Sequence, residues 1–213
     1  MRRISKRKQS GATIIEFTLS LTFMIPLLIG TFVFGFRLVQ SQQLDQITRD
    51  LAHMYSRGID FTTSGGASEA ESLADQFGLT ATGQCALFFS TITLETSAAC
   101  QAATGQTTCT NINQAVFTQQ VGIGNVTSNA SVFGTPSSTG SLPATSGVSN
   151  DYSSNPTAVQ QATDTWAVAN GFNNVLNLSS GQTVYVVEMY DNTPALSVGG
   201  ITGKPLVYSR AIF

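Results

Sequence analysis

The longest apolar run in the chain lies near its beginning. From Phe17 to Phe36, twenty consecutive residues carry no charge, and most of them are apolar. At a rise of about 1.5 Å per residue, a helix of this length spans roughly 30 Å, the thickness of the hydrocarbon core of a bilayer. Pro26 lies inside the run and predicts a kink, because proline removes one helical N–H. The run therefore predicts a membrane-spanning helix.

Two other interpretations fit this run less well. The length of the run, its basic flank and its lack of polar residues at helical spacing argue against a buried core helix. A secretory signal peptide that is removed behind the run would be shorter and would end in an Ala-x-Ala pattern. This run instead ends in Gly35-Phe36-Arg37. We therefore expect the segment to stay attached to the protein as an anchor.

The helix is expected to continue beyond the apolar run. Four apolar residues recur there at steps of three and four, which predicts one apolar stripe: Leu44, Ile47, Leu51 and Met54. A single helix from about residue 14 to residue 56, ending near Gly58, accounts for both segments. Its outer half should pack on the rest of the chain.

The remainder of the chain mixes helical and strand patterns. A short helix is predicted at residues 68–78, where Ser68 and Glu71 form a capping box and Gly78 ends the helix. Runs of β-branched and aromatic residues predict strands at 86–94, 115–121, 183–190 and 205–213, the last two paired with each other. A loose helical pattern covers 157–178, and the Ser/Thr/Asn-rich stretch 127–155 predicts a long surface loop.

These patterns predict an α+β fold class. A long N-terminal transmembrane and stalk helix is followed by a small head domain with an antiparallel sheet.

The charge distribution sets the orientation of the anchor. Five of the ten basic residues lie in the first eight positions, and all twelve acidic residues follow Gly11. From Ala12 onward, five basic and twelve acidic residues give a net charge of 5 − 12 = −7. A nucleic-acid-binding protein would need a basic patch on a folded face, so nucleic acid is excluded as a partner class. A basic cluster beside an apolar segment is typical of the cytoplasmic flank of a membrane helix.

The junction between the basic cluster and the apolar run contains a glycine and a glutamate. Gly11 and Ala12 follow the basic cluster, and Glu16 lies at the edge of the apolar run, where an ionised carboxylate is costly to bury. Cleavage between Gly11 and Ala12 would create an α-amino group one helical turn from Glu16. Glu16 could then pair with this ammonium group or with that of a neighbouring subunit. Alternatively, Glu16 is an interfacial residue without a special role.

These residues resemble a known family. The basic leader, Gly11, Glu16 and the apolar helix together resemble the prepilin-type signal of type IV pilins and pseudopilins. The Glu16-Phe17 pair and the continuation 34–38 into a polar helix resemble the TadE-like proteins, which are minor pilins or pseudopilins of the tight-adherence (Tad) pilus. The resemblance covers roughly residues 5–58.

The resemblance implies a division of the chain and a set of site residues. Residues 1–11 would be a leader, 12–58 the transmembrane and stalk helix, and 59–213 the periplasmic or extracellular head. Gly11 would precede the cut of a prepilin peptidase, and Ala12 would become the mature N-terminus. Glu16 and Phe17 would serve subunit assembly.

The resemblance also implies a location and partners. The protein would lie in the bacterial inner membrane as a single-pass protein, with its N-terminus cytoplasmic and its head periplasmic, or in a pilus outside the cell. Its partners would be the prepilin peptidase, other pilins or pseudopilins, the inner-membrane pilus assembly platform and membrane lipid. Because the major Tad pilins are very short, the long tail of this chain indicates a minor or priming subunit.

Three cysteines follow the membrane segment, where the chain should face an oxidising compartment. Cys85, Cys100 and Cys109 allow one disulfide and leave one cysteine unpaired. Cys100–Cys109 would close a short loop, whereas Cys85–Cys100 would join a strand to that loop, and the spacing does not choose between them. The chain has no CxxC motif and one histidine, so neither a metal nor a cofactor is expected.

The sequence contains no motif of an enzyme. It lacks GxSxG, HExxH, P-loop and GxGxxG patterns, and its single histidine, His53, is expected to be a solvated side chain. Glu188 and Asp191 are expected to be solvated charges near a strand end, and Trp166 to be a core or interface aromatic. Calcium binding through Asp151 has no supporting loop signature.

The second hypothesis is a binding module. The helix would then be a permanent anchor that is never cut, and the head would hold a partner protein or a surface ligand.

Overall fold

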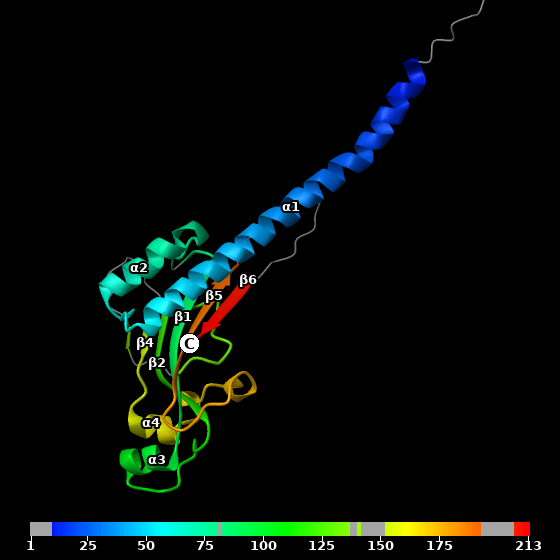
Figure 1. Cartoon of the computed structure of the whole chain (residues 1–213). Helices are drawn as coiled ribbons and strands as arrows, with labels where there is room; N and C mark the ends of the chain where they lie inside the picture. Colours follow the sequence, from blue (N-terminus) through cyan, green and yellow to red (C-terminus); the bar gives the residue numbers. More distant parts are fainter. Residues whose placement is uncertain (1–9, 81, 137–139, 142–151, 193–206) are drawn as a thin grey trace, which may run out of the picture.

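The computed structural model describes residues 10–80, 82–136, 140–141, 152–192 and 207–213. It consists of one long helix and an α+β head, as the sequence patterns predict (Figure 1). Helix α1 runs from Ser10 to Ser56 without interruption and, at 47 residues, is about 70 Å long. Pro26 lies inside it, and Figure 1 shows that the axis bends in its N-terminal half. Gly58, with φ of +89°, follows the helix as expected.

The head is built on a six-stranded antiparallel sheet with the order β3-β4-β2-β1-β5-β6. Its strands are β1 (Cys85–Leu94), β2 (Ala115–Gly124), β3 (Gly140–Ser141), β4 (Tyr152–Ser154), β5 (Thr183–Asp191) and β6 (Val207–Ile212). The four long strands lie where the sequence predicts strands, and β5 pairs with β6 as expected. Between Thr91 and Ile92 the register of β1 on β2 shifts, and this bulge turns Phe117 toward the same side of the sheet as Ile92.

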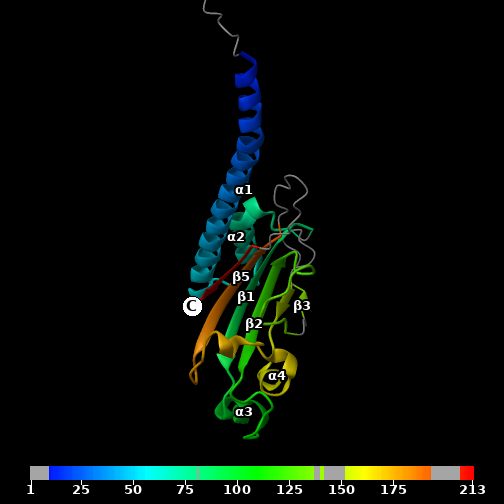
Figure 2. The ribbon, with the colours of Figure 1, turned by 90° about the vertical axis from the view of Figure 1, so that its right-hand side faces the viewer.

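Helix α1 and helix α2 (Ser64–Ala74) cover one face of the sheet (Figures 1 and 2). From the outer half of α1, Leu44, Leu51, Ala52 and Tyr55 are buried in the core beneath them. Ile47 and Met54 pack beside these residues, so the predicted stripe is confirmed. The Tyr55 hydroxyl group reaches the sheet, 2.7 Å from Thr91 Oγ1, and burial raises the pKa of Tyr55 to about 12.

Helix α2 begins earlier than predicted. Its N-cap is Thr63, whose side chain accepts a hydrogen bond from the Gly66 N–H, so the expected capping box of Ser68 and Glu71 is wrong. A short 3-10 helix (Asp75–Phe77) follows, and Gly78, with φ of +64°, ends the element as predicted. Ser68 and Glu71 do lie in a helix, but the helix begins one turn before Ser68.

The opposite face of the sheet is covered by irregular segments. Where a loose helix was predicted at 157–178, the chain forms α4 (Ala158–Thr163) and two 3-10 helices (Thr165–Ala167 and Phe172–Asn174). Gly171, with φ of +70°, separates the last of these. The prediction that 127–155 is a surface loop is wrong in its described part, because the stretch contains β3 and β4 and buries Phe133 against the sheet.

Helix α3 (Ser97–Thr104) and α4 lie together at the end of the head that is farthest from the free half of α1 (Figures 1 and 2). Here Asn111 joins the β1–β2 connection to α4, because its Nδ2 donates to the carbonyl groups of Gln161 and Asp164, at 2.8 Å each. The molecule therefore has a free helical end and a compact opposite end.

Candidate functional site

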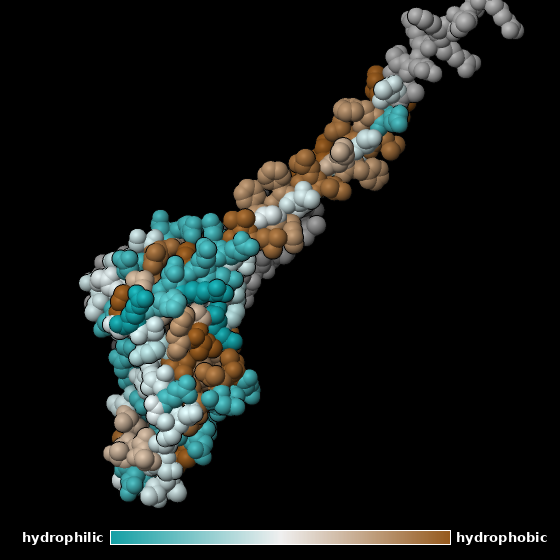
Figure 3. All heavy atoms as spheres, in the orientation of Figure 1, coloured by the Kyte–Doolittle hydropathy of each residue, from teal (hydrophilic) through white to brown (hydrophobic). Residues whose placement is uncertain are grey.

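The N-terminal half of α1 protrudes from the head and exposes its apolar side chains (Figure 3). Each of these side chains is at least half exposed: Ile14, Ile15, Phe17, Leu19, Phe23, Met24, Ile25, Leu27, Leu28, Phe32, Phe34, Phe36, Leu38 and Val39. Exposed apolar area of this extent is not tolerated by a free soluble domain and marks a surface that lipid or protein covers. The helix is long and apolar enough to cross a membrane.

Polar side chains of this segment bond to the helix itself. The hydroxyl groups of Thr18, Ser20, Thr22 and Thr31 each donate to a backbone carbonyl three or four residues earlier, at 2.8–2.9 Å. Such bonding satisfies hydroxyl groups where no water is present, as a bilayer or a helix bundle requires. Hydroxyl side chains are therefore compatible with an apolar environment around the helix.

The four residues predicted for processing and assembly lie at the beginning of this segment. Gly11 and Ala12 belong to the first turn of α1, and Glu16 and Phe17 follow on exposed positions of the same continuous helix. Positions four apart lie on one face of a helix, so Ala12 and Glu16 share a face. Residues 1–9 of the predicted leader lie outside the described residues.

At residue 40 the helix joins the head. Gln40 Nε2 donates to Asp191 Oδ2 at 2.7 Å, and Leu44, one turn later, is fully buried. The prediction that Asp191 is a solvated charge is therefore wrong, since Asp191 is buried at the end of β5 against α1. This contact marks the place where the free half of α1 leaves the head.

Glu188 corrects the sequence interpretation in the same way. It is fully buried in β5, on the sheet face opposite α1. Its carboxylate accepts hydrogen bonds from the Ser131 hydroxyl group, from the Val132 N–H at 3.1 Å and from the Tyr208 hydroxyl group at 2.8 Å. Burial raises the pKa of Glu188, although these hydrogen bonds and the charge of Arg210 act in the opposite direction. Sequence reasoning missed this cluster because two of its donors lie in the predicted loop.

The cysteines are placed as follows. Cys100 and Cys109 form a disulfide with a Cα–Cα distance of 6.0 Å, whereas Cys85 is buried and free at the start of β1. Burial raises the pKa of the Cys85 thiol well above its ordinary value, which makes it unreactive. The disulfide closes the loop after α3 at the end of the head that is remote from the free half of α1.

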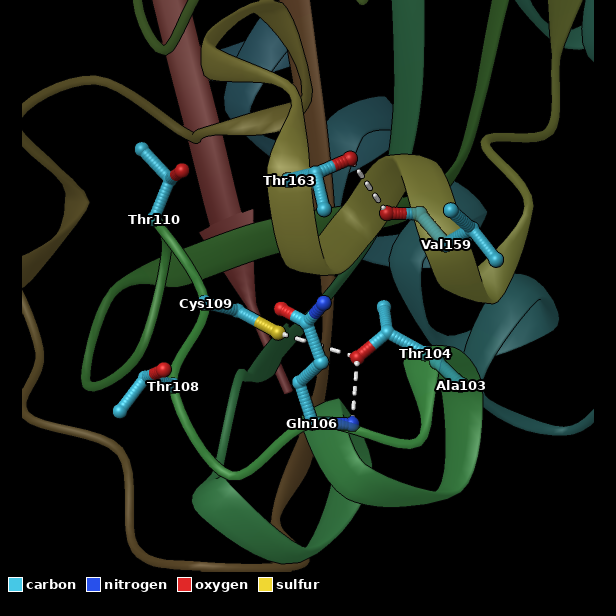
Figure 4. A pocket seen from close by; sticks show the side chains of 8 residues that line it. All are labelled: Ala103, Thr104, Gln106, Thr108, Cys109, Thr110, Val159 and Thr163. Carbon is cyan, nitrogen blue, oxygen red and sulfur yellow. Dashed lines mark hydrogen bonds between the residues drawn. The ribbon is translucent and has the colours of Figure 1, made fainter.

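A surface pocket lies beside this disulfide (Figure 4). Threonine hydroxyl groups, one amide and small alkyl groups line it: Ala103, Thr104, Gln106, Thr108, Cys109, Thr110, Val159 and Thr163. Figure 4 shows the Thr104 hydroxyl group bonded to Cys109 Sγ and to the Gln106 N–H, and the Thr163 hydroxyl group donating to the Val159 carbonyl group in α4. The lining can form hydrogen bonds, but none of these side chains is ionisable, so the pocket offers no acid or base.

His53, Trp166 and Asp151, the other candidates from the sequence, do not form a site among the described residues. His53 is exposed, and its ring centroid lies 4.3 Å from that of Phe213. Trp166 is half-buried in a 3-10 helix. Asp151 lies outside the described residues, and within the described ranges no three His, Cys, Asp or Glu side chains come together to hold a metal.

Fold and site together define a protein with a membrane-length helix that carries an α+β head on its outer half. A family model described as TadE-like protein matches residues 11–53, which confirms the TadE-like resemblance of this segment. The match covers Gly11, Glu16 and nearly all of α1 and leaves the head outside it. No curated protein and no solved structure gives a significant match to the chain.

Proposed function

We propose that this protein is a minor pilin or pseudopilin that assembles through its N-terminal helix into a Tad or type IV-like pilus or its membrane base. The observation that carries the proposal is the free, apolar half of α1, which coincides with the segment that matches the TadE-like proteins. A head without such a segment could fold but would have no means of joining a helical bundle. The role is structural rather than catalytic.

The proposed sequence of events begins at the membrane. The basic residues ahead of Gly11 hold the N-terminus in the cytoplasm, so the head lies on the periplasmic side. A prepilin peptidase cuts between Gly11 and Ala12, and the new α-amino group of Ala12 lies one turn from Glu16 on the same face. Packing between apolar helices supplies most of the association, and Glu16 sets the axial register by pairing with an ammonium group.

The proposed partners follow from this sequence of events. The prepilin peptidase and the inner-membrane assembly platform act on the precursor, whereas other pilins or pseudopilins and membrane lipid cover the exposed half of α1.

N-terminal sequencing of the membrane-extracted protein tests the proposal. In cells with a prepilin peptidase we expect a mature terminus at Ala12, and without the peptidase the terminus should remain ahead of Gly11. A terminus at Met1 in both strains contradicts the proposal and favours an uncleaved anchor whose head is a binding module.

A matched pair of variants tests the assembly step. Glu16→Ala should lower co-purification with other pilins, because the register of helix packing is lost, whereas Asp45→Ala, which removes an exposed carboxylate from the packed half of the same helix, should not. Equal co-purification of the two variants with the wild-type level would show that Glu16 is only an interfacial residue.

A further inference from the structure

Glu188 and Arg210 lie directly opposite each other on neighbouring strands of the head. They are partners in the register of β5 and β6, and their side chains share the sheet face opposite α1. The Tyr185–Phe213 pair exchanges both backbone hydrogen bonds, so Glu188–Arg210 is one of the non-hydrogen-bonded pairs, in which side chains come closest. Opposite charges at such positions ordinarily attract each other.

The two side chains, both in the described part of the chain, nevertheless form no ion pair. The Glu188 carboxylate accepts hydrogen bonds from neutral donors instead, and two of these donors, Ser131 and Val132, belong to one short segment. The Arg210 guanidinium instead lies over the ring of Phe133, 5.1 Å from its centroid, in the same segment. Both Glu188 and Arg210 thus contact the same segment, residues 131–133, rather than each other.

This segment, residues 131–134, is held to the sheet as a strap. The Ser131 hydroxyl group accepts from the Phe133 N–H at 3.2 Å, and Gly134, with φ of +98°, closes the turn by donating to the Ser131 carbonyl at 3.0 Å. Phe133 is buried, and its ring makes an edge contact with Phe172 at 5.0 Å. Val132, between them, is 57% exposed, so the strap has an outer surface.

We propose that residues 131–134 form a releasable strap, whose release lets Glu188 pair with Arg210 and uncovers the apolar seat of Phe133. In the docked state the carboxylate is buried without a paired cation, which is costly. In the released state Glu188 and Arg210 form an ion pair, and this pairing offsets part of the free energy that is lost when the strap leaves the sheet. The face of the head opposite α1 therefore has two arrangements: in one Glu188 bonds to the strap, and in the other it pairs with Arg210.

Hydrogen exchange on the full chain in detergent micelles tests the strap. The Val132 amide, bonded to Glu188 when the strap is docked, reports release, and the Phe89 amide in the central strand reports global unfolding. Salt weakens an exposed ion pair, so raising NaCl from about 20 mM to about 500 mM should increase the protection of Val132 about two- to fivefold relative to Phe89.

Variants at the opposed pair separate this effect from general salt effects. Arg210→Lys keeps the charge and should keep the salt response, whereas Glu188→Gln and Arg210→Gln should each abolish it. The same response in all four proteins, or none in the wild type, overturns the proposal. Equal protection of Val132 and Phe89 also overturns it, because the strap would then open only when the head unfolds. If Glu188→Gln fails to fold, Arg210→Gln still decides the question, because Arg210 is only partly buried and its replacement should be tolerated.

Discussion

Two adjacent glycines at the start of α2 differ in what surrounds them. A Cβ at Gly66 would lie 2.2 Å from the Asp60 carbonyl oxygen, whereas a Cβ at Gly65 would have nothing within 4 Å. The Asp60 carbonyl group cannot move freely, because it accepts hydrogen bonds from the Thr63 N–H and, at 2.7 Å, from the Thr63 hydroxyl group. Gly66 thus lets α2 approach the turn that precedes it.

This contrast gives a prediction at the residue scale. Gly66→Ala should lower the free energy of unfolding by about 1–3 kcal/mol, because the turn at Asp60 must shift. Gly65→Ala should leave it unchanged or raise it by up to about 1 kcal/mol through helix propensity. Chemical denaturation in detergent, followed by the fluorescence of the single tryptophan, measures both. Equal losses in the two variants would contradict the close approach at Gly66.

Glu188 shows what a sequence does not reveal about single residues. Its position in a strand was predictable, because the residues around it form the strongest β-pattern of the chain. Its burial was not, because the donors that satisfy the carboxylate come from residues 131–132, more than fifty positions away, and from Tyr208 on β6. Burial of a carboxylate depends on such long-range partners, and local pattern gives no information about them.

At the scale of elements, the sequence predicts those helices and strands whose residue pattern continues over many positions. The four long strands follow from runs of β-branched and aromatic residues, and the continuous α1 follows from an apolar run and the three-and-four spacing after it. The start of α2 was wrong because Ser68 and Glu71 match a capping box in the sequence, whereas the helix is capped by Thr63. The close approach to the turn at Asp60, which requires glycine at position 66, cannot be read from the local sequence. The short helices in 158–174 were missed because their ends depend on Gly171 and on packing against the sheet.

Helix α1 performs two tasks in two halves, and leucines in each half distinguish them. Leu51 is fully buried against the sheet, whereas Leu28 is 59% exposed. Leu51→Ala should destabilise the head by about 2–5 kcal/mol, the range for truncating a buried leucine. Leu28→Ala should leave the free energy of unfolding of the head unchanged.

Denaturation monitored by Trp166, which lies in the head, measures this pair of leucine variants. A loss of head stability in Leu28→Ala as large as that in Leu51→Ala would mean that the two halves do not act separately.

At the scale of the whole molecule, the head should fold with only the outer half of α1. A chain that begins at Gln40 keeps the bond to Asp191 and the buried Leu44, Leu51 and Tyr55, and it lacks the exposed apolar segment. We expect it to be monomeric without detergent and to unfold near the midpoint of the full chain. A chain that begins at Ile59 should not fold. It lacks the buried side chains of α1. Burial of one large apolar side chain contributes up to about 3 kcal/mol to the free energy of unfolding, and this free energy totals only about 5–15 kcal/mol for a whole domain.

Size-exclusion chromatography and thermal unfolding of the two truncated chains decide this point. If the chain from Gln40 aggregates without detergent, the head itself carries an apolar surface that needs a partner, and assembly would not be confined to the free helix. If the chain from Ile59 folds, the outer half of α1 is dispensable to the head. The buried side chains of α1 would then contribute little to the stability of the head, although they pack in its core.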